Sequence, residues 1–271
     1  MVRRRSAMAT LTMISLLIVA GLIGAWELYT HVGGVDEFLL PAPSAVAEAL
    51  VEDRGLLWEN FVVTAGEIGL GIGVAVALAL ACAVALHFSA DLRRALYPLL
   101  VGSQTIPIPI VAPLLVAWLG FGLAPKLAIV ALVCFFPIVV PTIDALARVD
   151  ADLRKLMRSF GASRWQTFRL VEAPAALPGL FTGAKLSVAF ATFAAILAEQ
   201  SGSENGLGHL VAQAIPQFET ARAYAAVLIL SAFAVALFGL LALAERRLAP
   251  WHRPGGVLAV GERRLPVDPH R

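Results

Sequence analysis

Residues 61–87 of the chain read FVVTAGEIGLGIGVAVALALACAVALH, an apolar stretch in which Glu67 is the one acidic residue and His87 the one histidine. A helix needs about 20 predominantly apolar residues to cross the hydrocarbon core of a bilayer, and this stretch exceeds that length. Glycine and alanine are frequent in its first half, and such small residues let neighbouring membrane helices pack closely. The stretch therefore predicts a membrane-spanning helix that packs tightly against others.

Five other stretches have the same character, and together they decide the fold class. Of the 271 residues, 59% are hydrophobic and 15% are charged. A soluble domain has about 45–50% apolar and about 25% charged residues, so this composition excludes a disordered chain, a collagen-like repeat and a water-soluble enzyme. We expect an all-α integral membrane protein with six transmembrane helices. The predicted spans are Met8–Tyr29, Phe61–His87, Leu96–Leu119, Leu127–Leu146, Leu177–Leu197 and Tyr224–Ala244.

The first span has an alternative interpretation as a cleavable signal peptide. Arg3, Arg4 and Arg5 precede its apolar stretch, as in the charged start of a secretory signal. The stretch is long for such a signal, however, and it continues to Trp26 and Tyr29, residue types that favour the membrane interface. A retained helix is the preferred interpretation, and cleavage would leave the orientation of the downstream chain unchanged.

The distribution of lysine and arginine predicts the orientation, since cytoplasmic segments are enriched in both. With the N-terminus in the cytoplasm, 17 of the 21 lysine and arginine residues fall in cytoplasmic segments and three fall in outer loops. Both termini are therefore expected to be cytoplasmic. Residues 1–249 are expected to form one transmembrane domain, followed by a flexible cytoplasmic tail at 250–271. The formal net charge of +2 is too small to indicate a nucleic-acid partner.

The third span carries the sequence SQTIPIPIVAP at 103–113. Each proline removes a helix donor and clashes with the preceding turn, so three prolines in this short segment predict a kink or a break. Carbonyl groups freed at a break inside the membrane must face protein or a water-filled path. Gln104, Thr105 and Pro107 are therefore candidate pathway residues, and a kink that serves helix packing alone is the alternative.

Two ionisable residues of the fifth span are further pathway candidates. Lys185 lies well inside the span, where an ionisable group is costly and usually finds a partner or water. It could bind an anion, or its ammonium could extend to the cytoplasmic interface, which is the preferred interpretation. Glu199 closes the span ahead of a polar, glycine-rich outer loop at 201–208, which could be a gate or a connector.

The loop between the fourth and fifth spans, at about 147–176, is the least membrane-like part of the middle of the chain. Four apolar residues at i, i+3, i+4 and i+7 predict one face of a short helix: Leu153, Leu156, Met157 and Phe160. Gly161 follows where a C-terminal cap often needs positive φ, and Ser163 can cap a second short helix that presents Trp165, Phe168 and Val171. Such a pair of helices could fill a groove on a cytoplasmic partner, or it could rest on anionic lipid.

Residues 158–183, RSFGASRWQTFRLVEAPAALPGLFTG, resemble the coupling loop of bacterial ABC-importer permeases, which carries the EAA motif. Four other segments resemble the nitrate, sulfonate and taurine branch of that family, which also includes transporters of vitamin precursors. These segments are LPAPS at 40–44, QTIPIPIVAPLLVAWL at 104–119, FFPIVV at 135–140 and GLG at 206–208. The resemblance extends from about Leu40 to Ala249, nearly all of the membrane domain.

The resemblance implies the type I importer fold, a six-helix core that dimerises in the bacterial cytoplasmic membrane. It also implies a cytoplasmic ATPase that receives the coupling loop and a periplasmic or lipid-anchored binding protein that delivers the solute. ATP would bind to the partner subunit, and this chain would hold no cofactor. The residues that the resemblance assigns to ATPase coupling are Lys155, Leu156, Met157, Phe160, Gly161, Ala162, Ser163, Leu177 and Pro178.

The coupling loop departs from the family pattern at its start. Lys155 stands where the family has glutamate, and Leu156 and Met157 stand where it has two alanines. A reversed charge and two bulkier side chains predict a dedicated ATPase, with a groove that is roomier or more acidic where it faces Lys155.

Two other classes of membrane protein are weighed against the importer. The sequence has no GxxxxGK[ST] phosphate loop, so the energy for import must come from another chain. A membrane-embedded enzyme would need clustered catalytic groups, but the five histidines are scattered and no HExxH metal motif occurs. A secondary transporter would show inverted repeats and intramembrane ion sites, and the sequence shows neither. The substrate stays open between sulfonate, nitrate or taurine-like anions and vitamin precursors.

Overall fold

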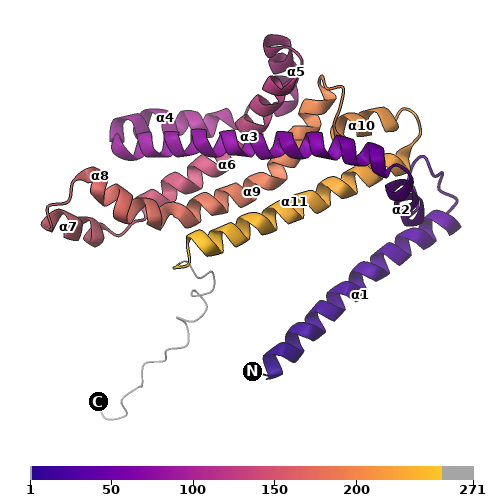
Figure 1. The fold of residues 1–271 in the computed structure, drawn as a ribbon, viewed down its shortest axis with the longest axis horizontal. Coiled ribbons are helices and arrows are strands. Elements are labelled where there is room, and N and C mark those ends of the chain that lie inside the picture. The colour runs from indigo at the N-terminus through magenta and orange to yellow at the C-terminus, as the bar shows by residue number, and fades with distance from the viewer. Residues whose placement is uncertain (1, 252–271) are drawn as a thin grey trace.

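A computed structural model describes residues 2–251, and every element of secondary structure in that part of the chain is a helix (Figure 1). Long apolar helices form a bundle, and short helices lie at its two ends. The elements are α1 (Val2–Val32), α2 (Pro43–Glu52), α3 (Arg54–Phe88), α4 (Ala90–Ser103), α5 (Ile108–Leu119), α6 (Leu123–Ala147), α7 (Ala151–Ser159), α8 (Arg164–Thr167), the π-helical turn η1 (Phe168–Glu172), α9 (Ala173–Gln200), α10 (Leu207–Ala214) and α11 (Thr220–Leu248).

Within residues 2–251, five helices are long and apolar enough to cross a membrane, and the bent pair of α4 and α5 makes a sixth if it counts as one span. The axes of α4 and α5 differ by 100° at the break between them, which contains Gln104 and Pro107. This confirms that the prolines break the third predicted span. Because six spans are present when the bent pair counts as one, the predicted all-α membrane fold is confirmed.

The core of the bundle is the contact of α6 with α3 and α9, and small residues make it possible. A Cβ added to Gly71 of α3 would lie 2.6 Å from the Cβ of Val130 on α6. A Cβ added to Gly183 of α9 would lie 2.5 Å from the carbonyl oxygen of Pro137, also on α6. At these two positions only glycine allows the observed helix separation, as expected for close packing in a membrane.

The short helices mark two opposite ends of the bundle (Figure 1). We call the end with α7 and α8 the loop end, and the end with α2 and α10 the cap end. α3 and α4 lie side by side and meet at the loop end, where Ser89 accepts a hydrogen bond from Leu92 N at 3.2 Å and caps α4. α1 contacts the rest of the chain mainly through α2, and its described side chains from Met13 to Gly24, Leu16 aside, are exposed.

Two details differ from the sequence-based expectations or lie beyond the described residues. The proline and serine residues at 41–44 predict a restart of the chain with Ser44 as the N-cap of a short helix, but the N-cap of α2 is Ala42, two residues earlier, and Ser44 lies in the first turn. Ser44 instead donates through its backbone amide and its hydroxyl to the carboxylate of Glu27, at 3.0 and 2.7 Å, and so joins α2 to α1. Of the predicted tail, residues 252–271 lie outside the described part of the chain.

Candidate functional site

The loop at about 147–176, which resembles a coupling loop, folds as two short helices joined by a sharp bend. The Asp150 side chain accepts from the amide of Asp152 at 2.8 Å and caps α7. Gly161 has a φ of +75°, which confirms the predicted left-handed residue after the first helix. Ser163 and Gln166 form a reciprocal capping box at the start of α8, as predicted for the serine.

The apolar residues of the first short helix point outward. Leu153 and Leu156 on α7 are exposed, and Phe160 just after it is 79% exposed. Leaving three large apolar side chains in water is unfavourable, and contiguous exposed apolar surface marks contact sites. This face has the composition of a surface that a protein partner or a membrane covers.

The second helix differs from the expected outward plug. Trp165 is exposed, but Phe168 is 8% exposed because it packs beneath the loop against His87 and Phe88. The ring centroids of Trp165 and Phe168 are 5.4 Å apart and stacked. Phe168 therefore anchors the loop on the end of α3, and the prediction that it is an outward-facing residue is wrong.

A polar contact joins α3, α7 and η1. Glu172 of η1 is buried, and its Oε2 lies 2.8 Å from Nε2 of His87 on α3. Its other oxygen lies 3.7 Å from Nη1 of Arg154 on α7. One carboxylate of η1 therefore joins the first short helix of the loop to the end of α3.

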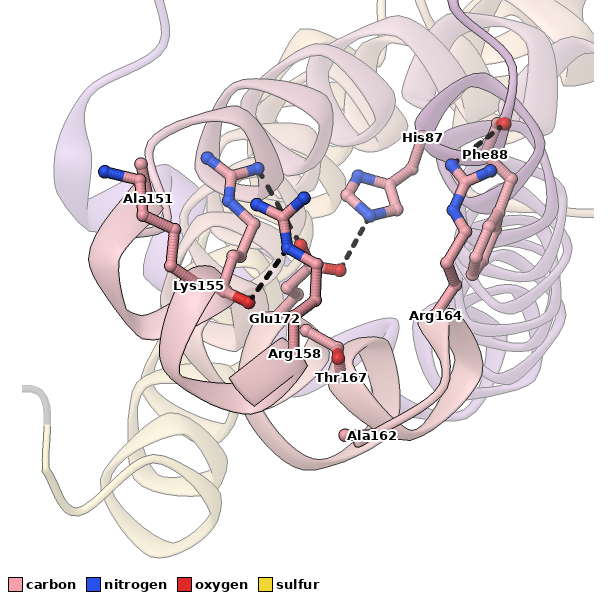
Figure 2. A pocket seen from close by; sticks show the side chains of 10 residues that line it. His87, Phe88, Ala151, Lys155, Arg158, Ala162, Arg164, Thr167 and Glu172 are labelled. Carbon is pink, nitrogen blue, oxygen red and sulfur yellow. Dashed lines mark hydrogen bonds and ion pairs between the residues drawn. The ribbon is translucent and has the colours of Figure 1, made fainter. Parts of the chain in front are cut away.

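A cavity of about 590 Å³ opens between the loop and the end of α3 (Figure 2). Figure 2 shows Lys155, Arg158 and Glu172 on one side of this opening and Arg164 beside Phe88 on the other. Lys155 Nζ donates to Asp152 at 2.8 Å, whereas Arg158 donates to the carbonyl of Arg154. The cavity is therefore basic, and its chemistry suits acidic groups of a partner. Its lining residues are His87, Phe88, Ala151, Arg154, Lys155, Arg158, Ala162, Arg164, Thr167 and Glu172.

The other coupling residues named by the family resemblance lie close by in the chain. Met157 and Ala162 are half-buried, while Gly161 and Ser163 are exposed at the bend. Leu177 and Pro178 are half-buried in the first turns of α9, behind the loop rather than on its outer face. The loop residues can thus contact a partner, and Leu177 and Pro178 support the helix from which the loop emerges.

A second cavity, of about 580 Å³, lies at the break between α4 and α5. The middle turns of α6 and α9 form its other walls. Gln104 lines it, and Thr105 and Pro107 belong to the same break. The full lining is Ser103, Gln104, Ile106, Ile108, Val111, Leu132, Val133, Phe136, Pro137, Val140, Pro141, Leu186, Phe190 and Phe193.

Lys185 and Glu199, the other predicted pathway residues, lie elsewhere in this conformation. Lys185 Nζ donates to Oε2 of Glu245 on α11 at 2.7 Å, so the lysine has a protein partner inside the bundle. Glu199 is fully buried at the cap end. Neither side chain lines the cavity at the helix break.

Glu199 holds the glycine-rich loop against the bundle. Its Oε1 accepts from the Thr64 hydroxyl at 2.6 Å, and its Oε2 accepts from the amide of Gly208 at 2.5 Å. Thr64 in turn accepts from the amide of Leu207 at 2.8 Å. The first turn of α10 is therefore fixed to α3 and α9 by a buried carboxylate and a hydroxyl.

A buried ion pair lies on the same side of the core. Lys126 of α6 donates to Oε1 of Glu67 on α3 at 2.6 Å, and both side chains are almost completely buried. Glu67 Oε2 has no hydrogen-bond partner among the described residues. This pair was not predicted, although an acid and a lysine within or next to apolar spans were the available signal. The contact of His87 with Glu172 was not predicted either, because the two residues lie 85 positions apart and no local pattern connects them.

Comparison with known proteins gives consistent family matches. The family model of the binding-protein-dependent transport system inner membrane component matches residues 71–250. A probable ABC transporter permease protein of Haemophilus influenzae is 34% identical over 82% of this chain and 91% of its own length. The riboflavin transport system permease protein RibX of Chloroflexus aurantiacus is 39% identical over 83% of this chain and 85% of its own. The taurine transport system permease protein TauC of Escherichia coli is 28% identical over 88% of this chain and 90% of its own length.

The fold also resembles a solved structure. A chain in the crystal structure of an amino acid ABC transporter with histidines superposes with a TM-score of 0.58 at 17% sequence identity. The match covers 73% of this chain and 96% of that chain. At this identity the likeness concerns the fold, and it agrees with the helical bundle described above.

Proposed function

Because the chain belongs to the family of binding-protein-dependent transport system inner membrane components, we propose that it imports a small solute by ATP-driven alternating access. Members of this family are permease subunits of ABC importers, so the chain is a transport subunit and not an enzyme. A separate cytoplasmic subunit binds and hydrolyses the ATP, since this sequence has no phosphate-binding loop.

The coupling loop is the observation that carries this proposal. It presents Leu153, Leu156 and Phe160 outward, and its underside is tied to α3 through Phe168 and Glu172. A loop that is apolar outside and rigidly attached inside can receive a push from a partner and pass it to the bundle. Docking on an ATPase accounts for both features, whereas resting on lipid accounts only for the first.

The orientation follows from the same assignment. If the loop end faces the cytoplasm, the segments on that side hold most of the lysine and arginine residues, as the positive-inside rule requires. Both termini then lie in the cytoplasm, and the protein is a multi-pass component of a bacterial inner membrane. The cap end, with α2 and α10, faces the binding protein that delivers the solute.

The transporter contains two permease copies in this proposal. The helix is interrupted at 104–107 beside the cavity at the α4–α5 break, and backbone groups freed inside a membrane must lie against protein or line a water-filled path. A second copy that packs there would enclose a pathway between the two chains. The relatives carry names that range from riboflavin to taurine transport, so they support a small solute without selecting one.

Co-purification tests the proposal. The tagged chain is expressed with its chromosomal neighbours, extracted in mild detergent and analysed by mass spectrometry. We expect an ATPase subunit at one-to-one stoichiometry, lost when Phe160→Ala removes the most exposed large apolar side chain of the loop. Phe121→Ala is the matched control, since Phe121 is 84% exposed but lies in the turn before α6, away from the loop. A chain that purifies without an ATPase and transports solute unaided would overturn the proposal.

A further inference from the structure

The cavity at the α4–α5 break lies beside the middle turns of α6 and α9, two helices long and apolar enough to span a membrane. α4 starts at the loop end and has 14 residues, so at about 1.5 Å per residue it is about 21 Å long, shorter than a hydrocarbon core of about 30 Å. The wall residues of α6 lie between Leu132 and Pro141, near the middle of that helix. Those of α9 lie between Leu186 and Phe193, again near the middle.

The open side of this cavity is not suited to lipid. Residues 101–107 are exposed, and the helix is interrupted between Ser103 and Ile108. Lipid chains cannot satisfy the hydrogen-bonding groups that a broken helix frees, so such a break lies against protein or lines an aqueous path. Occupation by a lipid chain is therefore disfavoured, and a passing solute with polar edges is favoured.

The lining combines aromatic rings with one free amide. Phe136 of α6 and Phe190 and Phe193 of α9 contribute three aromatic rings. Ser103 donates its hydroxyl hydrogen to the carbonyl of Leu100 at 2.7 Å, so it is already engaged. The Gln104 side chain makes no hydrogen bond to another described residue, and its amide can both donate and accept.

The cavity offers nothing that would pair with an anion. Its lining contains no charged residue among those that the structure describes. The lysines of the neighbouring helices are already paired, Lys126 with Glu67 at 2.6 Å and Lys185 with Glu245 at 2.7 Å. A sulfonate or nitrate that lost its water here would find no compensating cation, and burying an unpaired charge is strongly unfavourable.

From this chemistry we propose that the imported solute is an uncharged, planar heteroaromatic compound with amide-like hydrogen-bonding edges. Phe190 and Phe193 stack on the ring, Phe136 closes the wall, and Gln104 recognises a polar edge. These four side chains determine which solute the pathway accepts. This inference rests on the proposed import function. A flat ring stacks favourably on an aromatic side chain whatever its substituents, so these phenylalanines select for flat ligands.

The test uses the whole importer in proteoliposomes, with its ATPase and binding protein encoded beside this chain. ATP-dependent uptake is measured for two uncharged ring probes, a labelled aminopyrimidine alcohol and riboflavin, and for taurine, methanesulfonate and nitrate. We expect accumulation of a ring probe and none of the sulfonates or nitrate. Phe190→Ala and Phe193→Ala should each raise KM for the ring about tenfold.

Two further variants separate recognition from folding. Phe190→Tyr keeps the ring and should restore the KM of the wild type. Phe238→Ala removes a comparably exposed phenylalanine of α11 that does not line the cavity, and it should leave KM unchanged.

The outcomes distinguish this inference from the proposed function. ATP-dependent uptake of taurine, methanesulfonate or nitrate without a ring probe overturns the inference and leaves the importer intact. The inference also fails if an assembled, ATP-hydrolysing importer takes up neither ring, or if ring uptake is indifferent to Phe190→Ala and Phe193→Ala. Absence of both an associated ATPase and ATP-dependent uptake overturns the proposed function, and the inference with it.

Discussion

The carboxylate of Glu199 satisfies two buried donors at once, the Thr64 hydroxyl and the amide of Gly208. Leaving a buried donor unpaired costs about 1–3 kcal/mol, and removing this side chain would leave two buried donors unpaired. The residue was predicted to lie in the pathway, and in this conformation it holds the first turn of α10 on the bundle instead. The glycine-rich loop is therefore a fixed part of the cap end in the conformation described.

We predict that Glu199→Ala destabilises the protein by about 2–5 kcal/mol, because both donors lose their acceptor. Glu199→Gln keeps one amide oxygen as an acceptor and should cost less than half as much. The thermal unfolding midpoint of the detergent-solubilised protein measures both effects. Glu204→Ala, an exposed acid of the same loop, is the control. Equal midpoints for Glu199→Ala and Glu204→Ala would contradict the role given to Glu199.

At the scale of elements, local features of the sequence predicted local structure well. The prolines at 107–113 predicted the break between α4 and α5, Gly161 the left-handed bend and Ser163 the helix cap. The contacts of His87 with Glu172 and of Lys126 with Glu67 were not predictable in this way. They join different helices, and only the packing of α3, α6 and α9 brings these side chains together.

The bend at Gly161 provides a prediction at this scale. A Cβ added to Gly161 meets no atom within 4 Å, so any effect of substitution comes from the backbone. Gly161→Ala should destabilise the bend by about 1–2 kcal/mol, because residues other than Gly, Asn and Asp resist positive φ. We expect less ATPase to co-elute with Gly161→Ala, while Gly161→Asn keeps the wild-type amount. Loss of the ATPase with Asn but not with Ala would refute this explanation.

The contact between α3 and α6 provides another. Gly71→Leu should lower the unfolding midpoint, since the added side chain collides with Val130 and overpacking of a core costs about 1–3 kcal/mol or more. Gly73→Leu is the matched control on the same helix, because a Cβ there meets no atom within 4 Å. The helix packing described above is wrong if Gly73→Leu is the more damaging of the two.

For the whole molecule, the two ends of the bundle have different tasks. The loop end is basic and presents apolar side chains outward, which suits a soluble motor subunit. The cap end carries α2 and α10, with the acidic groups of Asp53 and Glu219 contacting Arg222. The aromatic cavity at the helix break lies between the ends. This arrangement predicts a single orientation in the membrane.

Labelling of single cysteines tests that orientation. In a chain that carries Cys82→Ser and Cys134→Ala, we expect a membrane-impermeant maleimide to label Glu204→Cys in intact cells. Ser159→Cys, at the end of α7, should be labelled only after the membrane is permeabilised. Both positions are exposed, so access to the reagent decides the result. The reverse pattern would show that the loop end faces outward.

The central claim is that this chain moves its solute with energy from an associated ATPase. Uptake by membrane vesicles that contain the chain and its neighbouring subunits tests it most directly, with ATP supplied inside and a protonophore added to abolish ion gradients. The account predicts uptake that needs ATP, survives the protonophore and disappears when the ATPase subunit is omitted. Uptake that proceeds without ATPase and ATP, and stops when the protonophore is added, would contradict it and identify a secondary transporter.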